Sequence, residues 1–253
     1  MQLTYFGANS WLLKLGEYHI LIDPWLVGSL MFGNLPWFFK GDKPPALDAL
    51  PDKIDLILLS QGLEDHTHKP TLTKLNKTIP VVASPSAAKV VQQLGYTQVT
   101  ALNFTQTFNL NESIEIRALP GAPIGPLVQE NAYLITEFSS KTTLYYEPHG
   151  YPATELKDYA PIDIVISPVV SLELPILGPI IQGHKTALQL AQLVKPKVFL
   201  PTAAGGDVTY HGFLNTILHT IGTVDELRSQ FTHHHLSTQL IEPQPGKVLE
   251  LKL

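Results

Sequence analysis

Short apolar runs separated by turn residues recur along the chain and predict β-strands. The first three predicted strands cover residues 2–6, 11–15 and 19–22. The second and third of these form a hairpin across Leu15-Gly16-Glu17. The run Leu56 to Leu59 is wholly apolar, which predicts a fully buried strand. Further predicted strands cover residues 80–83, 97–102, 108–110, 113–119, 131–135, 143–146, 162–167, 198–201 and 248–253.

Helices are predicted between several of these strands. Residues 85–94 carry apolar side chains on one face and are followed by Gly95, a typical residue at the end of a helix. A short helix is predicted to begin at Pro70, and longer ones over residues 184–193 and 224–233. Strands with crossover helices in both halves predict an α/β fold with layered sheets. With no break in composition, we expect one domain, 1–253, of two similar halves, about 1–130 and 131–253.

Composition and charge exclude several classes of function. The net charge is −5, and the 17 Lys and Arg residues are dispersed, so no basic stripe is available for nucleic acid. The absence of cysteine excludes disulfides and thiolate metal sites, leaving His, Asp, Glu and carbonyl oxygens as metal ligands. With no signal peptide or membrane-length apolar run, we expect a soluble cytoplasmic protein that does not bind membranes.

Residues 26–52 form a long irregular segment rich in aromatic side chains. Segments of this length are commonly lids, binding loops or disordered regions. Its aromatic side chains argue against disorder, because large apolar side chains favour burial. They are Phe32, Trp37, Phe38 and Phe39. They are consistent with a cap on the core and equally with an apolar pocket wall or docking patch.

Polar side chains gather where predicted strands end. Asp65 and His66 lie in the turn between the buried strand 56–59 and the helix that begins at Pro70, where side chains project above the sheet edge. Asp23 follows another apolar strand, where the simplest interpretation is a turn-forming residue. Glu147 and His149 follow the strand 143–146.

The order of these segments resembles the metallo-β-lactamase superfamily, in particular its branch of ascorbate-lactonase-like, small metal-dependent hydrolases. The resemblance implies a four-layer αββα sandwich with a metal site at the sheet edge. It rests on Gly7-Ala-Asn-Ser10, Leu21-Ile-Asp-Pro-Trp25, Leu58-Leu-Ser-Gln-Gly-Leu-Glu-Asp-His66, Ala118-Leu-Pro-Gly121, Leu144-Tyr-Tyr-Glu-Pro-His-Gly150 and Lys195-Pro-Lys-Val-Phe-Leu-Pro201.

The chain departs from the family's zinc-binding motif, His-x-His-x-Asp-His. Asp65 and His66 are retained, but the first two histidines are replaced by Gln61 and Leu63. The remaining family ligands are also replaced, a histidine at Ala122/Pro123, the bridging aspartate at Pro148 and the last histidine at Ala203. Leucine has no lone pair and a neutral amide is a poor zinc ligand, so dinuclear zinc is not expected.

The resemblance therefore implies one divalent ion at most (Zn, Mn or Mg), bound by Asp65 and His66 with His149 or Glu147. The alternative is a metal-free hydrogen-bonded cluster, in which a histidine–carboxylate pair can still act as a general base. The residues expected to orient or support these ligands are Asp23, Gln61 and His184.

Two functions are consistent with this pattern. The first is a hydrolase with an altered site, with Asp65 and His66 as catalytic residues and a small ester, lactone or phosphodiester as substrate. The second is an inactive, metal-free family member that binds a small apolar ligand or a protein partner. The pocket expected for it comprises Leu63, Trp37, Phe38, Pro123 and Pro148. The aromatic segment would also suit a contact in a homo-oligomer.

Overall fold

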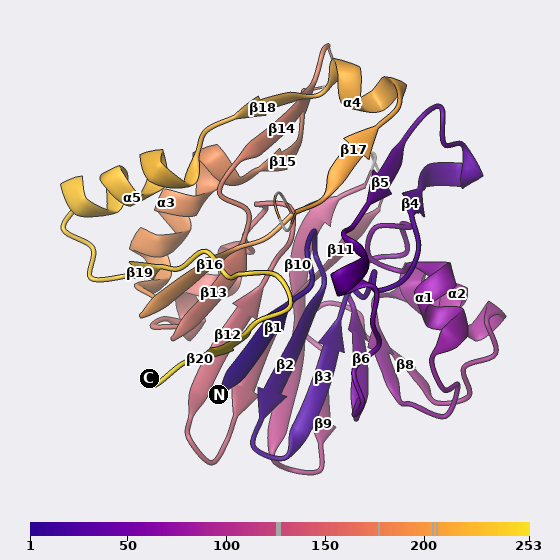
Figure 1. Ribbon diagram of the computed structural model, residues 1–253. Coiled ribbons are helices and arrows are strands. Elements are labelled where there is room, and N and C mark those ends of the chain that lie inside the picture. Colours follow the sequence, from indigo (N-terminus) through magenta and orange to yellow (C-terminus); the bar gives the residue numbers. More distant parts are fainter. Residues whose placement is uncertain (125–127, 177, 204, 206) are drawn as a thin grey trace. The chain divides into compact units, whose positions relative to one another are not determined.

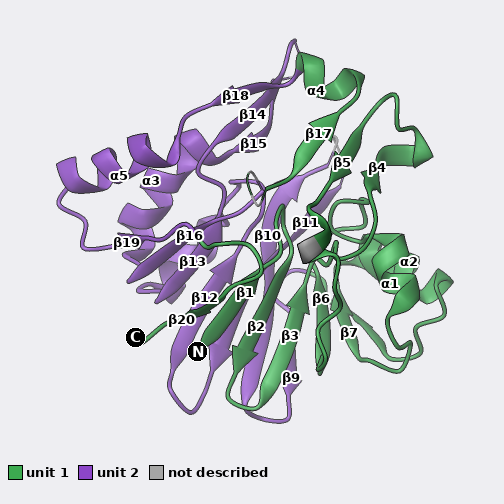
Figure 2. Ribbon diagram, viewed as in Figure 1, with its two compact units in different colours: residues 1–103, 205–217, 243–252 green, residues 104–204, 218–242, 253 purple. Residues whose placement is uncertain are grey.

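The computed structural model describes residues 1–124, 128–176, 178–203, 205 and 207–253 (Figure 1). The chain divides into two compact units, coloured separately in Figure 2. Unit 1 comprises residues 1–103, 205–217 and 243–252, and unit 2 comprises residues 104–204, 218–242 and 253. The predicted boundary between similar halves, near residue 130, falls within strand β11 (Gln129–Glu137) of unit 2.

The described residues of unit 1 form a seven-stranded sheet in the order β20-β1-β2-β3-β6-β7-β8. The pairs β20–β1, β1–β2 and β2–β3 are antiparallel, and the pairs β3–β6, β6–β7 and β7–β8 are parallel. The strands are β1 (Gln2–Tyr5), β2 (Trp11–Leu15), β3 (Tyr18–Ile22), β6 (Leu56–Leu59), β7 (Val81–Ala83), β8 (Val99–Ala101) and β20 (Val248–Glu250).

Helices α1 (Lys69–Lys74) and α2 (Pro85–Gln93) pack against this sheet. Ser84 begins α2, since its hydroxyl accepts a hydrogen bond from Ala87 N, and Pro85 suits the first helical position. The apolar face of α2 packs against side chains of β6 and β7. This helix confirms the predicted one to within a residue.

The aromatic segment, predicted as irregular, contains β4 (Leu30–Met31) and β5 (Lys40–Asp42). They form a small sheet with β17 (Thr209–His211), followed by α4 (Phe213–Ile217). Two short 3-10 turns, η1 (Phe32–Asn34) and η2 (Pro45–Leu47), complete the segment. The prediction of an irregular loop was wrong at these strands, because β4 and β5 are only two and three residues long and β5 is completed by β17, more than 150 residues away.

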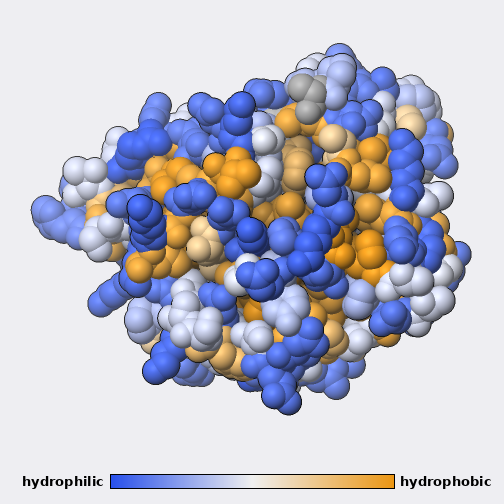
Figure 3. All heavy atoms as spheres, turned by 60° about the horizontal axis from the view of Figure 1, so that its bottom comes forward, coloured by the Kyte–Doolittle hydropathy of each residue, from blue (hydrophilic) through white to orange (hydrophobic). Residues whose placement is uncertain are grey.

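The aromatic side chains of this segment do not share one environment. Phe39 packs into a small cluster around the fully buried Trp25, with Phe32 and Phe38 partly buried at its edge. Trp37, in contrast, is 66% exposed. More widely, hydrophobic residues gather in patches between hydrophilic ones on the face drawn in Figure 3.

Lys43 provides a test of this cluster by pH. Its Nζ donates to the carbonyl of Trp25 and lies 4.3 Å from the centroid of the Trp25 ring. Burial lowers the pKa of Lys43 from 10.5 to about 7, although Asp48 acts in the opposite direction. Between these values the unfolded chain binds the extra proton, so this group makes the folded state more stable as the pH rises from 7 toward 10.5.

Lys43→Met removes that contribution. We expect the free energy of unfolding of the wild type, relative to that of the variant, to rise by at least about 1 kcal/mol between pH 7 and pH 9. Urea denaturation of both proteins at several pH values measures it, with Lys14→Met, a change in strand β2, as the control. A wild-type-minus-variant difference that does not change with pH would contradict the prediction.

The described residues of unit 2 form a second seven-stranded sheet, in the order β19-β16-β13-β12-β11-β10-β9. The pairs β9–β10, β10–β11 and β11–β12 are antiparallel. The pairs β12–β13, β13–β16 and β16–β19 are parallel, as are the pairs from β3 to β8 in the sheet of unit 1. Besides β11, the strands are β9 (Thr107–Leu110), β10 (Ile114–Pro123), β12 (Thr142–Tyr146), β13 (Ile164–Ser167), β16 (Val198–Pro201) and β19 (Gln239–Leu240).

Helices α3 (Gly183–Val194) and α5 (Val224–His233) contribute apolar side chains to the core of unit 2, next to side chains of the sheet. Thr223 and Glu226 form a capping box at the start of α5. A 3-10 helix, η3 (Thr154–Tyr159), follows β12. A further small sheet contains β14 (Ser171–Leu174), β15 (Gly178–Gln182) and β18 (His219–Ile221), none of which the local pattern predicted.

The helices were predicted closely, 184–193 as α3 and 224–233 as α5. Both have apolar stripes long enough to read from the sequence, whereas the missed strands have two to five residues each. Among the described residues, no helix combines the length and apolar character needed to cross a membrane.

Candidate functional site

The turn that follows β6 places Asp65 and His66 at the end of the buried strand. Backbone hydrogen bonds close it, since His66 N and Thr67 N both donate to Leu63 O, over 3.0 and 2.7 Å. Thr67 Oγ1 donates to Gln61 O, and Gly62 N donates to Ser86 Oγ over 2.9 Å. The turn is therefore fixed before α1 begins.

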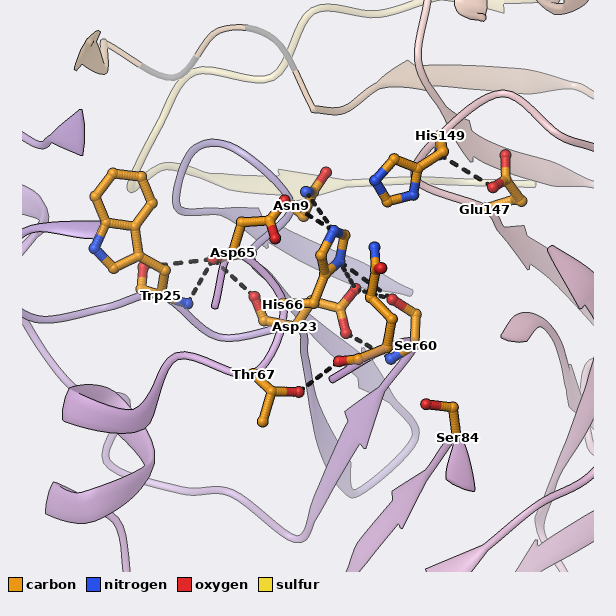
Figure 4. Close-up of polar contacts among 12 residues, drawn as sticks. Asn9, Asp23, Trp25, Ser60, Asp65, His66, Thr67, Ser84, Glu147 and His149 are labelled. Atoms are coloured by element: carbon orange, nitrogen blue, oxygen red, sulfur yellow. Dashed lines mark hydrogen bonds and ion pairs between the residues drawn. The ribbon is translucent and has the colours of Figure 1, made fainter. Parts of the chain in front are cut away.

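His66 is fully buried, and both of its ring nitrogens face polar groups of unit 1 (Figure 4). Nδ1 lies 2.7 Å from Asp23 Oδ2. Nε2 lies 3.1 Å from Asp65 Oδ2 and 3.2 Å from the side-chain amide of Asn9. Asp65 is only partly buried, with 21% of its side chain exposed, so the pair joins a buried imidazole to a more accessible carboxylate.

Asp23 is more than a turn residue. Its carboxylate is fully buried and accepts hydrogen bonds from Ser60 N, over 2.8 Å, and from Ser60 Oγ, besides its contact with His66. The backbone of Asp23 has φ 41°, a left-handed conformation that non-glycine residues seldom adopt. Ser10 stabilises it, because Ser10 Oγ donates to Asp23 O and accepts from Trp25 N.

These contacts set the charge of His66. Burial by itself lowers the pKa of the imidazole, but Asp65 and Asp23 outweigh burial and raise the pKa to about 10. In the absence of a bound cation, the ring therefore carries a proton on each nitrogen at neutral pH, and the Nε2 proton faces Asp65. A divalent cation on Nε2 would take the place of that proton in the same electrostatic environment.

The chemistry of these donors fits a divalent metal ion. A histidine ligand normally donates its other N–H to a carboxylate, which is the relation of His66 Nδ1 to Asp23. Nε2 is then directed toward a second ligand atom, Asp65 Oδ2. The family's first two histidine positions supply no imidazole, since Gln61 is buried and Leu63 is 41% exposed.

In unit 2, Glu147, Pro148 and His149 form the turn after β12. The Glu147 carboxylate is fully buried, and its Oε1 accepts from His149 N over 3.1 Å (Figure 4). Its Oε2 accepts from Tyr151 N over 2.7 Å. Pro148 is also buried, whereas His149 is half-buried. Glu147 therefore shapes the turn that carries His149.

A Glu147→Gln variant tests this role. One amide oxygen cannot replace two carboxylate oxygens, and the amide N–H₂ group faces a backbone donor, so we expect a loss of about 1–3 kcal/mol in the free energy of unfolding. Urea denaturation measures the change, with Glu137→Gln, at the end of β11, as the control. Equal stability of Glu147→Gln and wild type would contradict it.

The other predicted site residues belong to several elements of the two units. His184 lies in the first turn of α3, and its Nδ1 is 4.0 Å from the carboxylate of Glu226. Trp37 and Phe38 contact each other edge to face, with ring centroids 5.9 Å apart, in unit 1. Pro123 lines a cavity of unit 2. The role of all these residues in a site stays a prediction.

Sequence reasoning missed two members of the His66 network, Asn9 and Ser60. Both lie inside segments that carry the family resemblance, Gly7 to Ser10 and Leu58 to His66. Neither is an ionisable residue, so no charge pattern distinguished them from ordinary turn formers.

Residues 2–203 match the sequence profile described as the Beta-lactamase superfamily domain. The chain belongs to the metallo-β-lactamase superfamily. This confirms the resemblance inferred from the motifs, because the matched range contains every one of them.

Similar proteins of known sequence or structure are consistent with this family assignment. It is 36% identical to a cytidine monophosphate-N-acetylneuraminic acid hydroxylase of Asterias rubens over 99 residues, 37% of the chain and only 14% of the hydroxylase. It is 24% identical to a UPF0173 metal-dependent hydrolase of Halobacterium salinarum over 174 residues, 62% of the chain and 65% of that protein. Igni18, a metallo hydrolase of Ignicoccus hospitalis, superposes with a TM-score of 0.68 and 18% identity, covering 99% of each chain. The predicted α/β sandwich class and the small metal-dependent hydrolase branch are thereby confirmed.

Proposed function

We propose that this metallo-β-lactamase-fold protein is a hydrolase that uses one divalent ion at most and cleaves a small ester, lactone or phosphodiester. The observation that carries the proposal is the environment of His66. Its Nδ1 is bound to the buried Asp23 and its Nε2 is directed at Asp65, so a pair of ligand atoms is already oriented.

The limit of one ion follows from the residues that replace the family's histidines. Leu63 has no donor atom, and the position at Ala122/Pro123 has none in its side chains. One of the family's two zinc ions would therefore have no ligands at these positions.

His149 is proposed as the third ligand. The resemblance offers Glu147 or His149, and both oxygens of Glu147 already accept backbone hydrogen bonds. Those bonds hold the turn that carries His149, whose side chain is half-buried. Three protein ligands and one open position are typical of catalytic zinc sites.

A bound ion would polarise the substrate's carbonyl or phosphoryl oxygen and lower the pKa of a bound water. The chain's own residues have separate tasks. Asp23 holds the proton on His66 Nδ1 and keeps the ring in one orientation, and Ser60 holds Asp23. Asp65, the more exposed carboxylate, is able to accept a proton from an attacking water.

The alternative function is a metal-free protein that binds an apolar ligand or partner. The exposed side chains of Trp37 and Leu63 favour it, at 66% and 41% exposure. In that case Asp65, His66 and Asp23 serve only as a hydrogen-bonded cluster. A homo-oligomer formed through the aromatic segment is a related proposal, and we propose no nucleic-acid partner.

Elemental analysis of untagged protein after dialysis distinguishes the metal-dependent hydrolase from the metal-free binding protein. Because His233, His234 and His235 could carry metal through purification, the protein analysed should have all three changed to Gln. We expect about one equivalent of Zn, Mn or Mg, and not two, retained against dialysis. The rate of hydrolysis of p-nitrophenyl acetate, δ-valerolactone or bis(p-nitrophenyl) phosphate should fall when a chelator removes the metal ion. Metal at background, with stability unchanged by chelator, would contradict the metal-dependent function.

A further inference from the structure

Unit 2 contains a cavity of about 510 Å³, within the usual size of small-molecule sites. Its walls come from the end of β10, the start of β11, the turn after β12 and the first turns of η3 and α3. Every described residue that lines it belongs to unit 2.

The cavity is bounded by tightly packed backbone. At Gly121, a Cβ atom would lie 2.9 Å from Ala132 N, closer than side chains normally approach. Gly150 has φ +78°, and a Cβ there would lie 2.8 Å from Gly183 N. The buried Glu147 fixes the neighbouring Tyr151 through its backbone N–H. The shape therefore depends on backbone packing and a buried carboxylate, which makes it largely preformed.

The lining offers an anion no positive charge. No Lys, Arg or His occurs among the described lining residues, and the carboxylate present, Glu155, is exposed. Pro120, Pro123 and Pro152 supply apolar surface. Moving an anion into such a site costs several kcal/mol without a partner charge, and the carboxylate adds repulsion.

Most hydrogen-bond donors of the lining are already engaged. Gln129 Nε2 donates to Gly121 O over 2.9 Å, Tyr151 OH donates to Pro179 O, and Thr186 Oγ1 donates to Gln182 O. Among the described residues, the side-chain amide of Gln182 has no such engagement. A neutral amide is suited to an uncharged carbonyl, hydroxyl or amide group.

We propose that this cavity binds the uncharged body of the substrate, so that the protein acts on neutral esters or lactones and discriminates against anions, phosphodiesters included. The inference rests on the proposed function through His149. That residue lies on the same turn as Gly150 and Tyr151, which line the cavity, and its carbonyl accepts from Gln182 N over 2.8 Å.

Two probes of nearly equal shape test the charge preference. 4-Acetoxybenzamide is neutral and 4-acetoxybenzoate carries one negative charge, and ester cleavage releases a phenol from both. We expect kcat/KM for the amide probe to exceed that for the benzoate at least about 30-fold, corresponding to about 2 kcal/mol. Gln182→Lys should lower this ratio at least about 10-fold by supplying a positive charge. Gln192→Lys, an exposed position on α3, is the matched control and should leave the ratio unchanged.

Binding measured on metal-stripped protein by ligand-observed NMR separates this inference from the proposed function. Suppose that the benzamide binds more tightly than the benzoate, that Gln182→Lys reduces this difference, and that no ester is cleaved by the metal-loaded protein. The hydrolase function then fails and the cavity inference stands. If the ester is cleaved but the benzoate binds as tightly as the benzamide, or neither binds, the inference fails. Gln182→Glu should weaken benzoate binding further, and its melting temperature reports whether the fold is intact.

Discussion

A His66→Gln variant is expected to retain less than about one tenth of the divalent metal that the wild type binds, and to lose hydrolysis in proportion. His66 Nε2 is the imidazole donor beside Asp65 Oδ2, and a neutral amide is a much weaker ligand for zinc. The measurement is metal titration followed by elemental analysis, on protein without the histidines at positions 233–235.

His68→Gln is the matched control for this change. His68 is also buried and lies on the same turn, but its Nδ1 is 3.0 Å from Thr71 Oγ1 and its Nε2 is 3.3 Å from Ser29 O. We expect it to lose some stability and to keep its metal. Equal metal content in the His66 variant and the wild type would remove His66 from the proposed ligand set.

The second large effect is expected at Asp23. Asp23→Ala removes a buried carboxylate that receives two hydrogen bonds from Ser60 and contacts His66, leaving buried polar groups without their acceptor. Breaking such a buried pair costs about 3–5 kcal/mol in the free energy of unfolding. Metal affinity should fall about 10- to 100-fold as well, because His66 Nδ1 then loses the carboxylate that orients the ring.

Asp23→Asn separates these two contributions. The amide keeps the shape and one acceptor, so we expect a smaller loss of stability but a similar loss of metal affinity. Asp55→Ala is the control, since Asp55 is a partly exposed acid that pairs with His19, and exposed pairs contribute less than about 1 kcal/mol. If Asp23→Ala is no less stable than Asp55→Ala under urea denaturation, the buried network does not have the role assigned to it.

The sequence predicted the regular elements well where their signal is local. The apolar run 56–59 and the stripe of 85–94 reappear as β6 and α2 because burial on both faces, or on one helical face, leaves a pattern within a few residues. The two short strands of the segment 26–52 were missed by this approach, since β4 pairs with β5 and β5 in turn pairs with the distant strand β17. Long-range pairing of two or three residues leaves no periodicity to read.

For the candidate site, the sequence by itself determined which donor atoms exist. Asp65 and His66 occur in one predicted turn, and Gln61 and Leu63 occupy the positions of two family histidines. These facts can be read from the order of residues alone. Only the tertiary structure decided what those donors contact. The carboxylate of Asp23 reaches His66 from 43 residues away, and the two oxygens of Glu147 are used by backbone N–H groups. The physical reason is that residue type sets chemical capacity, whereas orientation and protonation depend on neighbours brought together by the packing of distant strands.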